Sequence, residues 1–87
     1  MAAPAKRLIA KQRDKRILLE LLRDIRKQKG LTQGELATRI GSKQAFISKY
    51  ETGERRLDFL DLVAICDVLP LSIVRFAERF EEARKTR

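Results

Sequence analysis

The stretch LTQGELATRIGSKQAFISKYE, residues 31–51, predicts two short helices joined by a tight turn, and the rest of the chain is arranged around it. Thr32 and Glu35 have the spacing of a capping box, in which the threonine hydroxyl accepts the amide of the third helical residue and the glutamate carboxylate accepts the cap amide. The first helix therefore begins at Gln33. Gly41 is placed where a left-handed residue ends a helix at little cost, so this helix ends just before it.

The second short helix has one apolar face and one polar face. Ile47 and Tyr50 lie three residues apart and are expected to face the core. Ala37 is the small residue that a steep crossing of the two helices requires where their backbones approach. The outward face, which is polar to basic, then consists of Gln44, Ala45, Ser48 and Lys49.

Three sequence words stand in a fixed order around this crossing. They are LRDIRKQKG at residues 22–30, LTQGELA at residues 31–37 and FISKYETGERR at residues 46–56. With Ala37, Gly41 and Ile47 at the fifth, ninth and fifteenth positions counted from the start of the first helix, the chain resembles the Cro/CI-type (XRE) family of DNA-binding regulators from about residue 16 to residue 80. The resemblance implies a compact all-α domain of five helices, of the lambda-repressor-like type, with helices two and three as the helix-turn-helix.

The composition fits a small basic domain. At 87 residues the chain supports one core, and 20 lysines and arginines against 12 acids give a net charge of +8, which suits a polyanionic partner such as double-stranded DNA. Residues 1–30 hold ten basic and three acidic groups, whereas residues 57–87 hold five and six. A role at a membrane surface would need a basic amphipathic helix, which residues 5–29 supply only weakly.

Other classes of protein are disfavoured by what the sequence lacks. No apolar run reaches the roughly 20 residues of a membrane span, and basic residues interrupt the N-terminal segment where a signal peptide needs a hydrophobic core, so we expect a cytoplasmic protein with no membrane partner. Cys66 is the single cysteine and histidine is absent, so neither a disulfide within the chain nor a zinc site is expected. No catalytic constellation or glycine-rich phosphate loop is present, and we expect no enzyme and no cofactor.

The helix that precedes the crossing is predicted over residues 16–29. Its apolar and basic residues take different parts of the helix circumference: Leu18, Leu21, Leu22 and Ile25 on one side, and Arg23, Arg26, Lys27 and Lys29 on the rest. Residues 1–15 form a basic extension of a domain that spans residues 16–87. The extension is interpreted either as a frayed arm or as a continuation of the helix, and Lys6 and Arg7 in it are candidate contacts to DNA phosphates.

Two further helices are predicted near the C-terminus. Asp58 and Ser72 are placed as N-caps, which gives a fourth helix over residues 59–68 and a fifth that begins at Ile73. Cys66 falls on the apolar stripe of the fourth helix, where a free cysteine behaves as a small hydrophobe. The fifth helix has an apolar face that is the candidate dimer interface, formed by Ile73, Phe76, Ala77 and Phe80.

The outward face of the second short helix has the chemistry that reads base pairs in the major groove. Glutamine pairs with adenine, lysine with guanine, and a small apolar group contacts the thymine methyl. Gln44, Lys49 and Ala45 supply one of each, and Ser48 is a fourth candidate. In the family, the residue that matches Gln33 contacts a phosphate and braces the residue that matches Gln44. The candidate contacts to the DNA backbone in this region are Gln33, Lys43, Arg55 and Arg56.

The second short helix can begin at either of two neighbouring positions. Ser42 replaces the usual apolar turn residue of the family, and Lys43 replaces its usual Ser or Thr cap, so either residue can be the N-cap. A cap at Ser42 would shift the reading row by one position. Phe46 has a half-outward position on this helix. It can either contact a thymine methyl group or be partly buried in the core.

The sequence thus predicts a sequence-specific transcriptional regulator, most simply a repressor that binds a pseudo-palindromic operator as a homodimer. The fifth helix would join the dimer, with Ile17 or Leu19 of the first as a second surface. An antitoxin that grips a toxin through its fifth or N-terminal helix is the alternative, followed by a coactivator-type module that bridges proteins. An ordinary helical bundle with no nucleic-acid partner is the plainest alternative.

Overall fold

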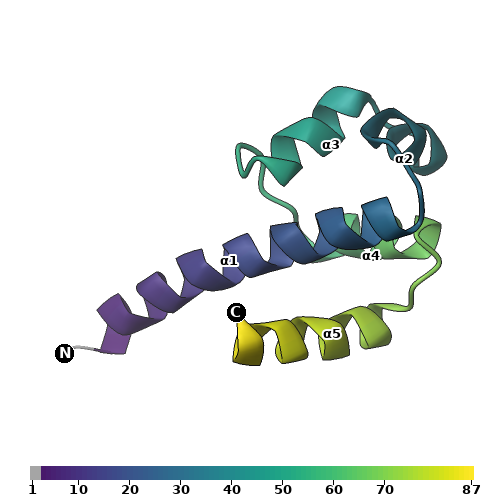
Figure 1. The fold of residues 1–87 in the computed structure, drawn as a ribbon. Coiled ribbons are helices and arrows are strands. Elements are labelled where there is room, and N and C mark those ends of the chain that lie inside the picture. Colours follow the sequence, from purple (N-terminus) through teal and green to yellow (C-terminus); the bar gives the residue numbers. More distant parts are fainter. Residues whose placement is uncertain (1–2) are drawn as a thin grey trace.

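The computed structural model describes the backbone of residues 3–87 and the side chains of residues 9–87, and within these limits every regular element is a helix (Figure 1). The helices are α1 (Ala3–Gln28), α2 (Gln33–Ile40), α3 (Gln44–Glu51), α4 (Phe59–Val68) and α5 (Ile73–Thr86). The predicted all-α fold with five helices is confirmed, and α2 and α3 form the helix-turn-helix. None of these helices combines the length and the apolar composition that crossing a membrane requires.

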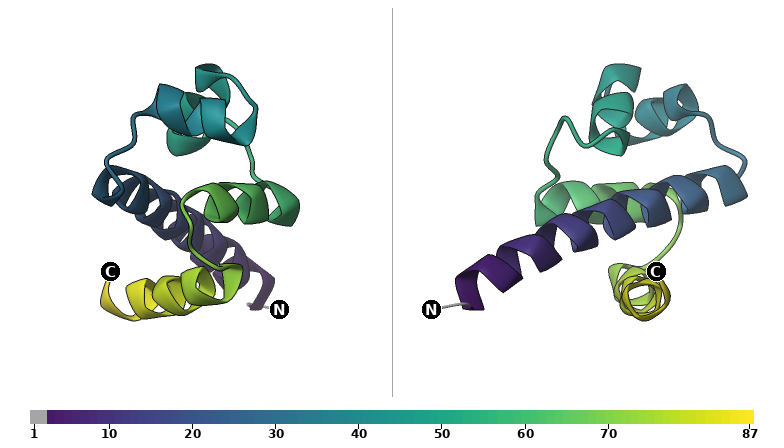
Figure 2. Two further views of the ribbon diagram at one scale, coloured as in Figure 1. Left: turned by 90° about the vertical axis from the view of Figure 1, so that its right-hand side faces the viewer. Right: turned by 60° about the vertical axis from the view of Figure 1, so that its left-hand side comes forward.

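Helix α1 is longer than the predicted helix over residues 16–29. It begins at Ala3, so α1 runs through residues 3–15 as a continuation of the predicted helix. Its N-terminal half runs past the ends of the other helices (Figures 1 and 2), and Ile9 there is 69% exposed. The side chains of Lys6 and Arg7 lie outside the described residues.

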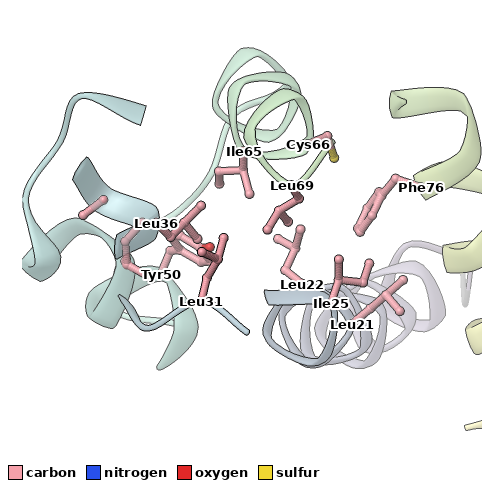
Figure 3. Packing of buried hydrophobic residues seen from close by; sticks show 12 residues of the cluster. Leu21, Leu22, Ile25, Leu31, Leu36, Tyr50, Ile65, Cys66, Leu69 and Phe76 are labelled. Carbon is pink, nitrogen blue, oxygen red and sulfur yellow. The ribbon is translucent and has the colours of Figure 1, made fainter. Parts of the chain in front are cut away.

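The core lies between the helix-turn-helix and helices α1 and α4, and α5 packs against α1 and α4. Leu22 and Ile25 of α1, Ile65 of α4 and Leu69, the C-cap of α4, are completely buried, and Phe76 of α5 closes the side away from α2 and α3 (Figure 3). Cys66 belongs to this cluster as predicted, and burial raises the pKa of its thiol to about 11.

Local capping explains where most of the helices begin. The Thr32 hydroxyl accepts the amide of Glu35, and the Glu35 carboxylate accepts the amide of Thr32, which is the predicted capping box. Asp58 and Asp61 form a second box at α4, and the Ser72 hydroxyl caps α5. Gly41 ends α2 with a φ of 73°, in the left-handed region that only glycine adopts freely.

Helix α3 begins differently. Its N-cap is Lys43, in extended conformation, and the side chain of Lys43 makes no capping hydrogen bond within the described residues. The register with Ser42 as the cap is therefore excluded. The reading row stays at the positions predicted from Gln44 onward.

Two predictions about the surface of the protomer need correction. Phe76 is only 2% exposed and packs in the core of its own chain, so it is not available to a dimer interface, and Ile17 is 1% exposed for the same reason. Arg26, which the helical pattern places on the polar side of α1, is buried as well, at 7% exposure. Its position continues the stripe of Leu18 and Leu22 at a spacing of four residues, toward α3.

Ion pairs hold the C-terminal end of α5 against α1. Arg84 pairs with Asp14 at 3.2 Å, and Arg87 pairs with Asp24 at 3.2 Å and with Glu20 at 3.6 Å. These pairs are partly exposed, so each contributes little to stability.

Candidate nucleic-acid interface

Helix α3 has a buried face and an exposed face, and it forms the outer edge of the molecule in Figure 1. Ile47 and Tyr50 are completely buried and anchor the helix. The outward positions belong to the predicted readers: Gln44, Ala45 and Lys49 are exposed, and Ser48 is half-buried. The four side chains therefore share one surface, and no residue of this row belongs to the core.

Gln33 lies beside Gln44, as the resemblance predicts. The Gln44 amide nitrogen Nε2 donates to the Gln33 oxygen Oε1 over 3.5 Å. Gln33 in turn donates through its own Nε2 to Oε1 of Glu51, over 2.9 Å. The Gln33 carboxamide is thus bound to Glu51 through its nitrogen and to Gln44, the first candidate reader of α3, through its oxygen.

A buried ion pair lies beneath this pair of glutamines. Arg26 of α1 donates through Nε to Oε2 of Glu51 over 2.7 Å and through Nη2 to Oε1 over 3.1 Å. The two side chains are 8% and 5% exposed. Arg26 also donates through Nη1 to the carbonyl of Leu31, over 2.7 Å, which ties the loop before α2 to the same guanidinium.

Sequence reasoning missed the roles of Arg26 and Glu51. Arg26 looks like one more basic residue in a basic helix, and Glu51 looks like the last polar residue of α3. The available signal was their positions: Arg26 follows Leu22 by four residues and Glu51 follows Ile47 by four, so each extends a buried stripe. Opposite charges at the ends of two such stripes are what a buried pair requires.

The loop after α3 carries the predicted arginine clamps. Gly53 turns the chain with a φ of 86°, and the Arg55 amide donates to the carbonyl of Lys49 over 3.1 Å. The Arg55 guanidinium lies over the ring of Phe46, 4.7 Å from its centroid, and that ring meets Tyr50 edge-on. Phe46 is half-buried, and the face of its ring supports the Arg55 cation. In this stacked arrangement the N–H groups at the edge of the guanidinium remain available to an acceptor.

The remaining backbone candidates lie around the same surface. Arg56 and Lys43 are exposed, Lys43 at the start of α3 and Arg56 after Arg55 in the loop. Lys15 of α1 donates to the carbonyl of Gly53 over 3.1 Å, so the long first helix supports the loop from below. Lys43 thus precedes the exposed row of α3 in the chain, and Arg55 and Arg56 follow it.

The helix-turn-helix family HTH_3 matches residues 22–76, which is more than half of the chain. The chain belongs to this family. Solved structures agree with this assignment and with the XRE type. No protein with a curated description matches the sequence.

Three solved structures illustrate the similarity of this XRE-type chain to known proteins. An XRE-family like protein from Pseudomonas syringae pv. tomato str. DC3000 is 33% identical over 94% of this chain and 96% of its own, with a TM-score of 0.79. The wild-type restriction-modification controller protein C.Esp1396I is 27% identical over 85% and 96%, with a TM-score of 0.80. The clp gene regulator ClgR from C. glutamicum, 24% identical over 82% and 91% with a TM-score of 0.71, shares the fold.

Family membership has a direct consequence for this XRE-type chain. The family consists of DNA-binding regulators and is not an enzyme family, so the chain is a DNA-binding protein of the helix-turn-helix type. The surface just described is the one that presents the second helix of that motif.

Proposed function

We propose that this protein is a transcriptional repressor that binds a pseudo-palindromic operator as a homodimer, with α3 in the major groove. The observation that carries the proposal is the exposed row on α3, in which Gln44 is braced by Gln33 and which Lys43, Arg55 and Arg56 flank along the chain. A row of this kind combines direct readout with the phosphate attraction that supplies most of the affinity.

Each reader has a role that follows from its chemistry. Gln44 pairs with adenine through one donor and one acceptor, Lys49 donates to guanine, and the Ala45 methyl contacts thymine. Ser48 lies beside them and donates to a base edge or a phosphate oxygen. The proposed contacts to the DNA backbone are Gln33, Lys43, Arg55 and Arg56, joined by Lys6 and Arg7 from the start of α1.

Repression requires only that the protein occupies its operator. A single α3 reads too few base pairs for useful specificity, so two copies would meet half-sites one helical turn apart. We assign the interface to the exposed side of α5, where Val74 is 67% exposed and Ala77 is exposed beside it. Ile73 and Phe80, both half-buried, flank this side, whereas Phe76 contributes to the core only.

Selection from randomised DNA, followed by binding to the selected site, tests the readers against the clamps. We expect Gln44→Ala to cost about 1–3 kcal/mol on the selected site and to relax the preference at one base pair per half-site, with little change on random DNA. Arg55→Ala should lower the affinity for both the selected site and random DNA, and should reduce the slope of log affinity against log salt concentration by about one. Gln12→Ala, an exposed glutamine of α1, is the matched control and should change neither.

Equal losses on both DNAs for Gln44→Ala and Arg55→Ala would contradict the assignment of Gln44 as a reader. If neither variant altered DNA binding while the protein stayed folded, the fold would act as a module for binding proteins.

Sedimentation with and without the selected site tests the homodimer. We expect Val74→Asp to dissociate the dimer and to weaken operator binding without unfolding the protein, because this side chain is exposed in the protomer. Ile9→Asp on α1, which exposes a similar fraction of its side chain, is the control. A wild-type protein that sediments as a monomer both free and on DNA would exclude the proposed assembly.

A further inference from the structure

Four side chains form a continuous chain of contacts from the core to the reading surface. Arg26 of α1 donates to Glu51 of α3, Gln33 of α2 donates to the same carboxylate, and Gln44 of α3 donates to Gln33, over 2.7, 2.9 and 3.5 Å. Along this chain the residues pass from buried, through half-buried at Gln33, to exposed at Gln44. Each contact joins two different helices.

The direction of these contacts follows from the chemistry of the carboxylate. An ionised carboxylate only accepts hydrogen bonds, whereas a carboxamide donates at one end and accepts at the other. Glu51 therefore requires Gln33 to turn its NH₂ group inward. The Gln33 oxygen then has to face outward, and Gln44 has to present its own NH₂ group to it.

We propose that Glu51 is a positioning residue that sets the direction of the Gln44 carboxamide through Gln33, and thereby the base that Gln44 prefers. The inference rests on the proposed function. With one N–H on Gln33, the Gln44 amide keeps its oxygen and its second N–H for the DNA. This is the pair of groups that matches N6 and N7 of adenine.

Arg26 makes Glu51 suitable for this role. Two hydrogen bonds from one planar guanidinium fix the carboxylate in position, and the side chain is nearly inaccessible to solvent. A surface glutamate would rotate and leave the Gln33 amide free to turn over. The buried Glu51 carboxylate thus sets the orientation of the exposed Gln44 side chain.

Glu51→Gln tests the proposal with almost no change of shape. The new carboxamide offers one acceptor and one donor where two acceptors were, so it no longer dictates which end of Gln33 faces inward. At the base pair read by Gln44, the ratio of affinity for adenine to affinity for the other bases should fall by about tenfold. Glu54→Gln removes the same charge from an exposed site three residues on, and should leave the ratio unchanged.

A double-mutant cycle separates positioning from loss of fold, because the ratio of affinities is insensitive to the fraction of folded protein. Gln33→Ala should lower the ratio by itself, and Glu51→Gln should have no further effect on it in the Gln33→Ala background. The Gln33→Ala variant leaves the buried pair intact and so remains informative if Glu51→Gln does not fold.

The outcomes distinguish this inference from the function on which it rests. A wild-type protein with no base preference would overturn both. A wild-type preference for adenine that survives Glu51→Gln or Gln33→Ala would overturn the inference alone. A full effect of Glu51→Gln in the Gln33→Ala background would also overturn it, because Glu51 would then act by another route.

Discussion

Helices α2 and α3 are equal in length and adjacent in the chain, yet different interactions hold them in place. Helix α2 begins at a complete capping box and ends at a left-handed glycine, all within residues 32–41. Helix α3 begins at Gln44 after an N-cap, Lys43, whose side chain makes no capping hydrogen bond among the described residues, and Arg26 of α1 holds its far end through Glu51. The supporting helix is thus defined by local sequence, and the reading helix by distant residues.

Breaking the buried pair should have the largest effect. Arg26→Met leaves the Glu51 carboxylate buried without its cation, and we expect the free energy of unfolding to fall by about 3–5 kcal/mol. Urea denaturation measures it. The double variant Arg26→Met with Glu51→Met buries no charge and should regain part of the loss, whereas a double variant no more stable than Arg26→Met would show that the pair is not the unit that holds α3.

Enlarging the residue at the crossing should have the next largest effect. Ala37 is 2% exposed in the core cluster, and Ala37→Leu should cost about 1–3 kcal/mol because the extra atoms force α2 and α3 apart. Ala45→Leu adds the same atoms to the exposed face of α3 and should change stability by less than about 0.5 kcal/mol. Thermal unfolding of the two variants tests this, and equal losses would place the crossing elsewhere.

Removing the caps compares the two helices directly. Thr32→Ala removes a hydroxyl that accepts the Glu35 amide and should cost about 1 kcal/mol. Lys43→Ala removes an N-cap side chain that makes no such bond and should cost less than about 0.5 kcal/mol. The difference is measurable by chemical denaturation. A larger loss at Lys43 would mean that α3 also depends on local capping.

The smallest effect should be a dependence on pH at α2. The hydrogen bond from the Thr32 amide lowers the pKa of Glu35 below its ordinary value of 4.5. A lowered pKa in the folded state means that this contribution to stability is fully present above about pH 4.5 and is lost as the pH falls through the folded value. Between pH 5 and pH 3, the free energy of unfolding should fall less with falling pH in Glu35→Gln than in Glu54→Gln. Glu54 is the control because its carboxylate makes no cap contact among the described residues.

The features predicted correctly from the sequence are those that depend on nearby residues. The caps at Thr32, Asp58 and Ser72 act over three residues, so their chemistry is legible in the sequence, and the spacing of Ile47 and Tyr50 is enough to orient α3. The family resemblance supplied the contact between Gln33 and Gln44, which spacing alone does not give.

The features that were missed depend on packing between distant segments. Arg26 and Glu51 are 25 residues apart, and only the approach of α1 to α3 turns two polar residues into a buried pair. Phe76 also depends on packing between distant segments. The apolar face of α5 is equally compatible with a core and with a dimer interface, and only the position of α5 against α1 and α4 places Phe76 in the core. The part of α1 just before residue 16 contacts a distant segment as well, because Asp14 pairs with Arg84, 70 residues further along the chain.

The separation of the two faces of α3 has a consequence for protein engineering. Gln44, Ala45 and Lys49 are exposed and contribute nothing to the buried cluster, so libraries that randomise these three positions should consist mostly of folded proteins. Glu51 belongs outside such a library, because its carboxylate accepts hydrogen bonds from both Arg26 and Gln33. New operator preferences can therefore be sought on an unchanged scaffold, provided that the residue at position 44 still donates a hydrogen bond to the Gln33 oxygen.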